Sequence, residues 1–555
     1  MVELRGVGAI QRFVVILFGL RSQSALDTSI SRLPFHGPHP TLPHTMKRLY
    51  LFLACTFGLL FATSMLAQQP GEDFIRTSFF DATLALPHSN IQPAAVGLDT
   101  NYYQAVDAMY HPPASQRLQL QAFGSLASGF DRGSSNHTVS PSFAGLDAQW
   151  QPNQSWFAQA GYALAGGFLP NYMASTADQY RFIPGYGYAI QDNKTNLYHA
   201  HYTFGKIAFC PSKHFQFEAG KGKHFWGDGH RSLILSDNAA PAPYFRITTS
   251  FWKLRYTNLW MQLRDISLLH SMQNARIKYS ALHALSYDVT RKLNVSLYEM
   301  VVWQDRDSMS RRTLDMGYLN PLIFYRPVEY ALGSPDNVII AASFKWHAFK
   351  RLQFYGQFVL DEFNLKLFKK DNNWWGNKIG GQLGLKWQPH KKLYVNSEIN
   401  AVRPFTYTHG SAIQSWTHLN QPMAHPLGAN FLESTNRVVF TTNSWKLEEQ
   451  INASLFGRDY DANADGVADN FGGDIIRSYK NPYGGPYGHE LLQGELHKVI
   501  YHSLTISHAM RSKSRMEIFI NHTLRMERSN TANLSDHYVM IGIRTLGLLQ
   551  PVQDY

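Results

Sequence analysis

The chain has 555 residues and carries 51 Lys and Arg against 40 Asp and Glu, a net charge of +11. This excess is modest and scattered, which argues against a nucleic-acid-binding protein, where basic residues usually gather into a stripe or tail. Aromatic residues make up 14% of the chain and charged residues only 16%. Transmembrane β-barrels have this balance, although a soluble carbohydrate-binding β-protein could share it.

A secretory signal peptide is predicted at residues 46–67. Met46, Lys47 and Arg48 supply the charged start, residues 49–67 form an apolar run, and Ala67 offers a small residue for cleavage. The alternative is an uncleaved anchor helix. Residues 1–45 then precede a complete signal peptide, so we interpret them as an upstream start assigned too early, with Met46 as the true start.

The segment that follows, residues 68–113, alternates little, and both a plug and a periplasmic arm are open for it. We expect the barrel to occupy residues 114–555. Cys55 lies within the signal peptide, so Cys210 is the single thiol of the mature chain. No Cys/His motif surrounds Cys210, which favours a structural role over a catalytic one.

Alternating strands joined by short basic turns recur along the rest of the chain. Each unit has a strand of about ten residues, a tight polar turn and a return strand. The strand pairs are centred on the turns at 210–214, 288–292, 348–351, 388–392 and 511–515. No second apolar run is long enough to form a membrane-spanning helix.

Longer connections rich in Gly, Asn, Asp and Pro separate these units, for example 221–275, 304–337 and 401–434. Short turns at one end and long loops at the other are typical of outer-membrane barrels, whose closure leaves no unpaired strand edge in lipid. The fold class predicted is therefore all-β: an antiparallel transmembrane barrel of about 16–18 strands with short periplasmic turns and long extracellular loops.

An acidic stretch near the C-terminal third has the opening of a calcium-binding loop. Oxygen ligands recur at Asp461, Asn463, Asp465 and Asp469, and Gly466 permits a sharp turn. The twelfth position is Gly rather than Glu, so the usual bidentate ligand is missing. Calcium binding and an acidic surface turn both remain open, and no other cofactor is indicated.

No motif for catalysis stands out, so we expect a protein that is not an enzyme. No nucleophile elbow, phosphate-binding glycine loop or zinc spacing is present. His199 and His201 share a face if the segment is a strand, but without a third ligand they read as polar residues of the lumen or interface. Trp374 and Trp375 could cover the apolar faces of sugars, or belong to an interfacial aromatic belt.

Several ordered motifs carry a resemblance to a known family. They read KGKHFWGDGHRSLILSDNAAPAPYFRITTSFWKLRYTNLW at 221–260, YLNPLIFYRPVEYALGSPDN at 318–337, WWGNKIGGQLGLK at 374–386, VRPFTYTHG at 402–410 and NQPMAHPLGANF at 420–431. This set resembles a family of Bacteroidetes outer-membrane proteins described as capsule-assembly Wzi-like proteins or as the gliding-motility protein RemB. The stretch 225–232 is the family's hallmark, with His230 where Tyr is expected.

The resemblance implies a non-enzymatic outer-membrane barrel that engages capsular or exopolysaccharide. The alternative is a gliding-motility or secretion-associated surface component that contacts other envelope or motility proteins. A diffusion porin is the third hypothesis. Trp226, within the hallmark, joins Trp374 and Trp375 as a candidate polysaccharide-binding residue. A buried charged network in the lumen is expected from five further residues: Asp228, Arg231, Asp237, Arg326 and Glu329.

Overall fold

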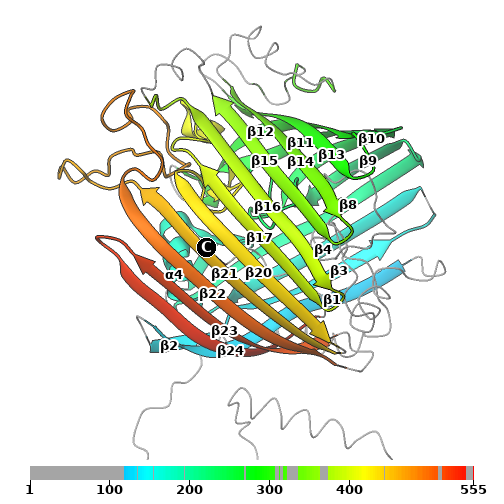
Figure 1. Ribbon diagram of the computed structural model, residues 1–555, viewed down its shortest axis with the longest axis horizontal. Coiled ribbons are helices and arrows are strands. Elements are labelled where there is room, and N and C mark those ends of the chain that lie inside the picture. The colour runs from blue at the N-terminus through cyan, green and yellow to red at the C-terminus, as the bar shows by residue number, and fades with distance from the viewer. Residues whose placement is uncertain are drawn as a thin grey trace, which may run out of the picture. The chain divides into compact units, whose positions relative to one another are not determined.

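Figure 1 shows the computed structural model of the chain. The structure describes residues 118–133, 136–153, 155–192, 194–267, 271–306, 312, 315, 317–321, 336–362, 373–442, 444–510, 516–545 and 554. The segments expected at 1–45, 46–67 and 68–113 lie outside the described residues, as do Arg326 and Glu329.

Eighteen long strands in the described part of the chain form one antiparallel sheet that closes on itself. In chain order they are β1 (Leu118–Arg132), β3 (Ser142–Trp150), β4 (Trp156–Gly167), β8 (Leu197–Ser212), β9 (Phe215–Gly222), β10 (Ala242–Phe251), β11 (Leu254–Asp265), β12 (Arg276–Asp288), β13 (Leu293–Gln304), β14 (Asn337–Phe349), β15 (Leu352–Glu362), β16 (Lys378–His390), β17 (Leu393–Val402), β20 (Phe431–Thr442), β21 (Trp445–Arg458), β22 (Glu495–Ala509), β23 (Met516–Arg528) and β24 (Asn533–Thr545). Each pairs with its neighbours in this order, and β24 pairs with β1, with Ser125 opposite Arg544. The predicted antiparallel barrel is thus confirmed, at the upper end of the expected strand number.

The connections between the long strands contain several short strands and helices. Strand β2 (Asn136–Val139) extends β1, and β7 (Ile190–Asp192) pairs with β8. Two small hairpins join β5 (Phe182–Ile183) to β6 (Gly187–Tyr188) and β18 (Thr417–His418) to β19 (Gln421–Pro422). One α-helix, α4 (Asn171–Tyr180), and two 3₁₀ turns, Met272–Asn274 and Ala412–Gln414, complete the described elements. None of the helices in these residues is both long and apolar enough to cross a bilayer.

The strand register places the short turns at one end of the barrel and the long connections at the other. The turn residues 213–214, 290–292, 350–351 and 391–392 share an end with the start of β1 and the end of β24. The opposite end carries the long connections, including 168–196, 223–241, 403–430 and 459–494. We call these the turn end and the loop end.

One predicted connection is wrong. The range 221–275 was expected to be a long loop, but it contains the whole β10–β11 hairpin. That hairpin turns at Trp252 and Lys253 without Gly, Pro, Asn or Asp, and Trp252 adopts a positive φ of 54°. A bulky residue in this conformation gives no turn signal in the sequence.

The outer wall of the barrel is apolar. Outward residues such as Ile340, Phe358 and Leu383 are 43%, 49% and 65% exposed, while inward neighbours on the same strands, such as Ile339, Val359 and Gln382, are buried. A girdle of exposed aromatic residues marks the turn end; its members are Trp150, Trp156, Phe251, Trp252, Trp346, Phe349, Trp387 and Trp445. An apolar wall bounded by an aromatic girdle is the surface that a bilayer requires, and the chain is an integral barrel of the outer membrane.

The interior is filled by segments from the loop end. Leu233, Ile234 and Leu235, from the connection between β9 and β10, are fully enclosed. Helix α4 lines the inner wall at β23 and β24, where the Asn171 backbone N–H donates to Asp536 and the Arg525 guanidinium lies 4.8 Å from the centre of the Tyr172 ring. In Figure 1 this helix lies behind β21 and β22, inside the ring of strands.

Candidate functional site

The segment 223–241 forms the centre of the interior. Its Trp226 N–H donates to the Leu235 carbonyl at 2.8 Å, and the Ser232 hydroxyl donates to the Trp226 carbonyl at 2.6 Å, which closes the segment into a compact loop. The barrel wall holds this loop through Gln357 of β15, whose side-chain oxygen accepts from the Leu233 N–H at 2.7 Å. We call residues 223–241 the inner loop.

Trp226 is only 1% exposed and packs 5.7 Å from Tyr298, measured between ring centres. Its ring is enclosed by the barrel core, so no sugar can stack on it in this arrangement. The proposal that Trp226 binds polysaccharide is therefore corrected: its bulk fixes the inner loop against β13.

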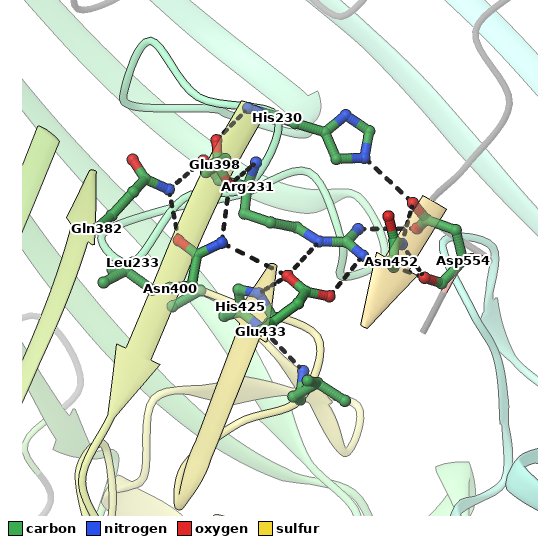
Figure 2. Close-up of polar contacts among 12 residues, drawn as sticks. His230, Arg231, Leu233, Gln382, Glu398, Asn400, His425, Glu433, Asn452 and Asp554 are labelled. Carbon is green, nitrogen blue, oxygen red and sulfur yellow. Dashed lines mark hydrogen bonds and ion pairs between the residues drawn. The ribbon is translucent and has the colours of Figure 1, made fainter. Parts of the chain in front are cut away.

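Arg231 lies at the heart of the interior with its guanidinium almost completely buried (Figure 2). Its Nε and Nη2 donate to the two carboxylate oxygens of Glu433 at 3.2 and 3.1 Å, and Nη1 donates to Asp554 at 2.8 Å. The paired, forked geometry is what a buried guanidinium needs, because an unpaired charge in a dry interior is costly. Burial alone lowers the pKa of Arg231, but the Asp554 and Glu433 carboxylates outweigh it and raise the pKa above its ordinary value.

The two carboxylates that bind Arg231, those of Glu433 and Asp554, have further partners. His425 Nε2 lies 2.7 Å from Glu433, while Asp554 is contacted by His230 at 3.1 Å and by Asn452 of β21 (Figure 2). Burial tends to raise the pKa of Asp554, but the Arg231 and His230 side chains hold it well below its ordinary value. Asp554 therefore lies ionised inside the barrel and links the inner loop to the wall.

A second carboxylate holds the backbone of the same loop. Glu398 of β17 accepts from the His230 and Arg231 N–H groups at 2.8 and 3.1 Å, and from the Tyr355 hydroxyl at 2.8 Å. Gln382 of β16 donates to the Arg231 carbonyl at 3.0 Å. The arrangement positions and locks the inner loop; it presents neither a nucleophile paired with a base nor an open coordination site.

The other residues expected in the lumen network lie elsewhere. Asp228 approaches Lys345 of β14 at 3.9 Å, and the Asp237 backbone carbonyl accepts from Lys223 at 3.1 Å. Neither contact joins the Arg231 cluster, and Arg326 and Glu329 are outside the described residues. The partners that the structure assigns to Arg231 come from β20 and from residue 554, distant in sequence.

Sequence reasoning missed Glu398, His425, Glu433 and Asp554. Glu398 and Glu433 had a signal, because each occupies an inward position on a strand whose outward neighbours are apolar, such as Ile399 and Leu432. A carboxylate at such a position needs an internal cation. Asp554 had no signal, since it lies in no strand.

An aromatic cluster lies at the loop end, built from three different connections. The Trp375 and Tyr479 rings lie 4.4 Å apart, Trp374 lies 5.4 Å from Trp375, and Phe405 packs edge-on against Trp375 at 6.1 Å. Lys378 Nζ lies 4.3 Å from the centre of the Tyr479 ring. We call Trp374, Trp375, Phe405, Lys378 and Tyr479 the rim cluster.

The rim cluster is partly accessible: Trp374, Trp375 and Tyr479 keep some exposure, whereas Phe405 and Lys378 are buried. Trp374 and Trp375 are half-buried, and two tyrosines on the same long connection, Tyr483 and Tyr487, are 38% and 50% exposed. Because the Trp375 N–H donates to the Pro486 carbonyl at 3.2 Å, the loop that carries these tyrosines is fixed against the cluster.

The acidic loop predicted for calcium uses its carboxylates to cap its own backbone. Asp461 accepts from the Asp465 and Gly466 N–H groups at 3.0 and 2.7 Å, and Asp469 accepts from Ala462 and Asn463. Among the residues that the structure describes, no group of three His, Cys, Asp or Glu is arranged to hold a metal ion. Calcium binding here stays a prediction, tested by comparing protease cleavage of the loop in calcium and in chelator.

No family model and no curated protein matches this chain. Among solved structures it is similar to Wzi, an Escherichia coli outer-membrane protein involved in group 1 capsule assembly and described as a carbohydrate-binding β-barrel, with 12% identity, a TM-score of 0.47, and coverage of 76% of this chain and 84% of that chain. It is also similar to OccAB2 of Acinetobacter baumannii (9% identity, TM-score 0.40, 76% and 97% covered) and to OprD of Pseudomonas aeruginosa (10%, 0.40, 76% and 94%). At this distance the function has to be argued from the chain's own residues.

Proposed function

We propose that this protein is a non-enzymatic outer-membrane barrel that binds polysaccharide at the cell surface, in the assembly or attachment of capsule or exopolysaccharide. The observation that carries the proposal is the rim cluster with the exposed tyrosines beside it. Sugars present apolar C–H faces between their hydroxyl groups, and flat aromatic rings are the side chains that cover such faces.

The rim cluster is preorganised for such a ligand. Trp375 is held between Phe405 and Tyr479, and Lys378 is fixed beneath Tyr479 by an ion pair with Glu362 at 3.3 Å. Rings that are already fixed lose little conformational entropy on binding. More of the interaction energy with each sugar unit therefore remains as binding free energy.

The filled interior favours a binding protein over a diffusion porin. The inner loop, α4 and Asp554 occupy the space inside the ring of strands and are tied to its wall by buried hydrogen bonds. A general diffusion channel needs a continuous water-filled path, which such packing opposes.

Binding of purified capsular or extracellular polysaccharide to the detergent-extracted protein tests the proposal. The variants Trp375→Ala and Tyr487→Ala should weaken binding by about tenfold, a factor that corresponds to the loss of one good ring contact. Trp445→Ala, an exposed aromatic of the turn end, is the matched control and should bind as the unaltered protein does. Equal binding by all the variants would contradict the proposed site.

A clean deletion strain, scored together for capsule retention and for gliding, separates this function from the surface-motility role that the sequence resemblance also implies. Loss of capsule retention with normal gliding is the result expected here. The reverse pattern would favour the motility role.

A further inference from the structure

Outward side chains at mid-strand are apolar over most of the barrel wall, as β14, β15 and β16 illustrate with Ile340, Phe358 and Leu383. This is the rule for a lipid-facing surface, where ionisable groups find neither water nor partners. Departures from the rule on the outer wall therefore indicate that something other than lipid covers the position.

One departure is a row of four titratable side chains across β21–β24: Glu449, His502, His522 and His537. His502 Nε2 lies 3.3 Å from Glu449 Oε1, the His502 and His522 rings lie 6.0 Å apart, and the Nε2 atoms of His522 and His537 lie 2.9 Å apart. We call these four residues the polar row. The side chain of Glu449 is 45% exposed and that of His502 27%.

The polar row lies at membrane depth rather than at an interface. On each of its strands the next outward residues to either side are mostly apolar and exposed; those with printed exposures are Leu447, Ile451, Ile500, Ile520 and Val539, between 39% and 51%. Glu449 comes four residues after Trp445 of the aromatic girdle, toward the loop end. The polar row therefore lies in the middle of the apolar outer wall, with apolar residues on both sides of it along the strands.

A second set of outward polar side chains is covered by a loop of the chain itself. Asn258, His283 and Glu299 lie directly opposite one another on β11–β13, yet each is at most 3% exposed. The connection after β13 covers this face: the His283 side chain is hydrogen-bonded to the backbone of Asn320, and the Trp260 indole donates to the Tyr318 carbonyl at 2.8 Å. The chain shields one polar set with its own loop, whereas the polar row stays exposed in the described structure.

The hydrogen-bond donors and acceptors of the polar row favour a second copy of this chain as the partner. It carries a carboxylate and imidazoles on one face, so the same surface on a second copy offers acceptors to its donors and donors to its acceptors. Uncharged polar residues continue the band onto β17 and β20, where the Ser397 hydroxyl donates to Asn436 at 2.7 Å and Asn436 donates to Ser434 at 3.1 Å. A self-complementary patch of this kind is what a twofold interface uses.

We propose that the outer wall over β17–β24 is a homodimer interface within the membrane plane, with the polar row at its centre. In the dimer, the polar rows of two barrels hydrogen-bond across the interface and are removed from lipid. The inference does not depend on the proposed polysaccharide binding, which concerns the loop end.

Cysteine crosslinking in intact outer membranes tests the interface. In a Cys210→Ser background, Ile451→Cys and Ile500→Cys flank the polar row. The matched control is Phe245→Cys, an exposed outward position on β10, which is eight strands away from β22 around the barrel. A short bis-maleimide should give a band of twice the monomer mass from the first two and none from the control. Only protein that shows the heat-modifiable mobility of a folded barrel is scored.

Three results would overturn the proposal: no crosslink at the flanking positions, equal crosslinking on both walls, or an adduct with a different protein. A second variant checks the role of the row itself. Replacing Glu449, His502, His522 and His537 together by Leu should leave the folded barrel intact and convert the dimer to monomer on native gels in mild detergent. A dimer that survives this change would also contradict the proposal.

Discussion

At the scale of single residues, the charges of the Arg231 cluster are tolerated inside the barrel because groups of opposite charge surround them. Arg231 meets two carboxylates and Glu433 meets a guanidinium and an imidazole, so neither is left bare in a dry interior. On the outer wall, the Glu449 side chain contacts His502 at 3.3 Å and is still 45% exposed in the part of the chain that the structure describes. This exposure separates the polar row from the enclosed cluster around Arg231.

The Arg231–Glu433 pair should matter for stability. The Glu433→Ala variant leaves a buried guanidinium with only Asp554 as carboxylate partner, and we expect a loss of about 3–5 kcal/mol in the free energy of unfolding. Urea unfolding in liposomes, followed by tryptophan fluorescence, measures it. Glu490→Gln, at an exposed loop position, serves as the control and should change stability by less than about 0.5 kcal/mol. A Glu433→Ala barrel as stable as this control would show that the pair is dispensable.

The connection 459–494 should respond to pH through Asp474. Burial, reinforced by the Asp459 carboxylate, raises the pKa of Asp474 from 3.8 to about 6. When the loop opens, Asp474 ionises at its ordinary lower pKa, so the closed loop loses stability as pH rises from about 4 through about 6. Hydrogen exchange should therefore show about tenfold more opening at pH 7.5 than at pH 5, after correction for intrinsic exchange rates. The variant Asp474→Asn should abolish this dependence and Asp465→Asn should retain it; a pH dependence that persists in Asp474→Asn would refute the assignment.

At the scale of elements, the hairpin is the unit from which the barrel is built, and its two kinds of connection have different structural roles. Short turns such as 391–392 close neighbouring strands, while long connections fold back inside or cover the rim. The inner loop is the clearest case, since its backbone is held by Glu398, Gln382 and Gln357 from three consecutive strands.

The turn end should face the periplasm. Epitope tags placed after Lys213, Lys292, Lys350 and Lys391 should be hidden on intact cells, because all four turns share one end and short turns are periplasmic in outer-membrane barrels. Tags near Asn373 and Asp465, at the loop end, should bind antibody without permeabilisation. Accessibility of all four turn tags would invert the topology and remove the rim cluster from the cell surface.

At the scale of the whole molecule, the chain combines a closed wall with an interior filled from the loop end. The wall accounts for membrane residence through its apolar belt and aromatic girdle. The filling opposes conduction through the centre and is compatible with the proposed binding at the rim.

Planar-bilayer conductance should distinguish these two behaviours. The unaltered protein should show no stable open-channel current, because the inner loop is packed against the wall. Replacement of residues 226–239 by a short Gly-Ser linker should produce a stable open-channel current. A large steady conductance of the unaltered barrel would favour the porin reading.

The mature protein should begin near Gln68, after a signal peptide that starts at Met46. N-terminal sequencing of the membrane-extracted protein measures this directly. Residues from 1–45 at the N-terminus would refute both the start and the cleavage site.

The sequence by itself determined the barrel, because its physical cause is local. Alternation along strands such as 499–510, short basic turns such as Lys391–Lys392 and the scarcity of charge are each visible within a few neighbouring residues. The β10–β11 hairpin escaped detection, since a turn at Trp252 and Lys253 carries none of the usual residues.

Only the tertiary structure decided how the interior and the outer wall are used. Arg231 and Glu433 are 202 residues apart, and Asp554 is 323 residues from Arg231, so these side chains meet only when the inner loop and residue 554 lie inside the closed barrel. Trp226 read as a candidate sugar ligand and proved to be core, because exposure depends on what packs around a ring. The polar row emerged in the same way: four ordinary polar residues on separate strands become one surface only when the register of β21–β24 aligns them.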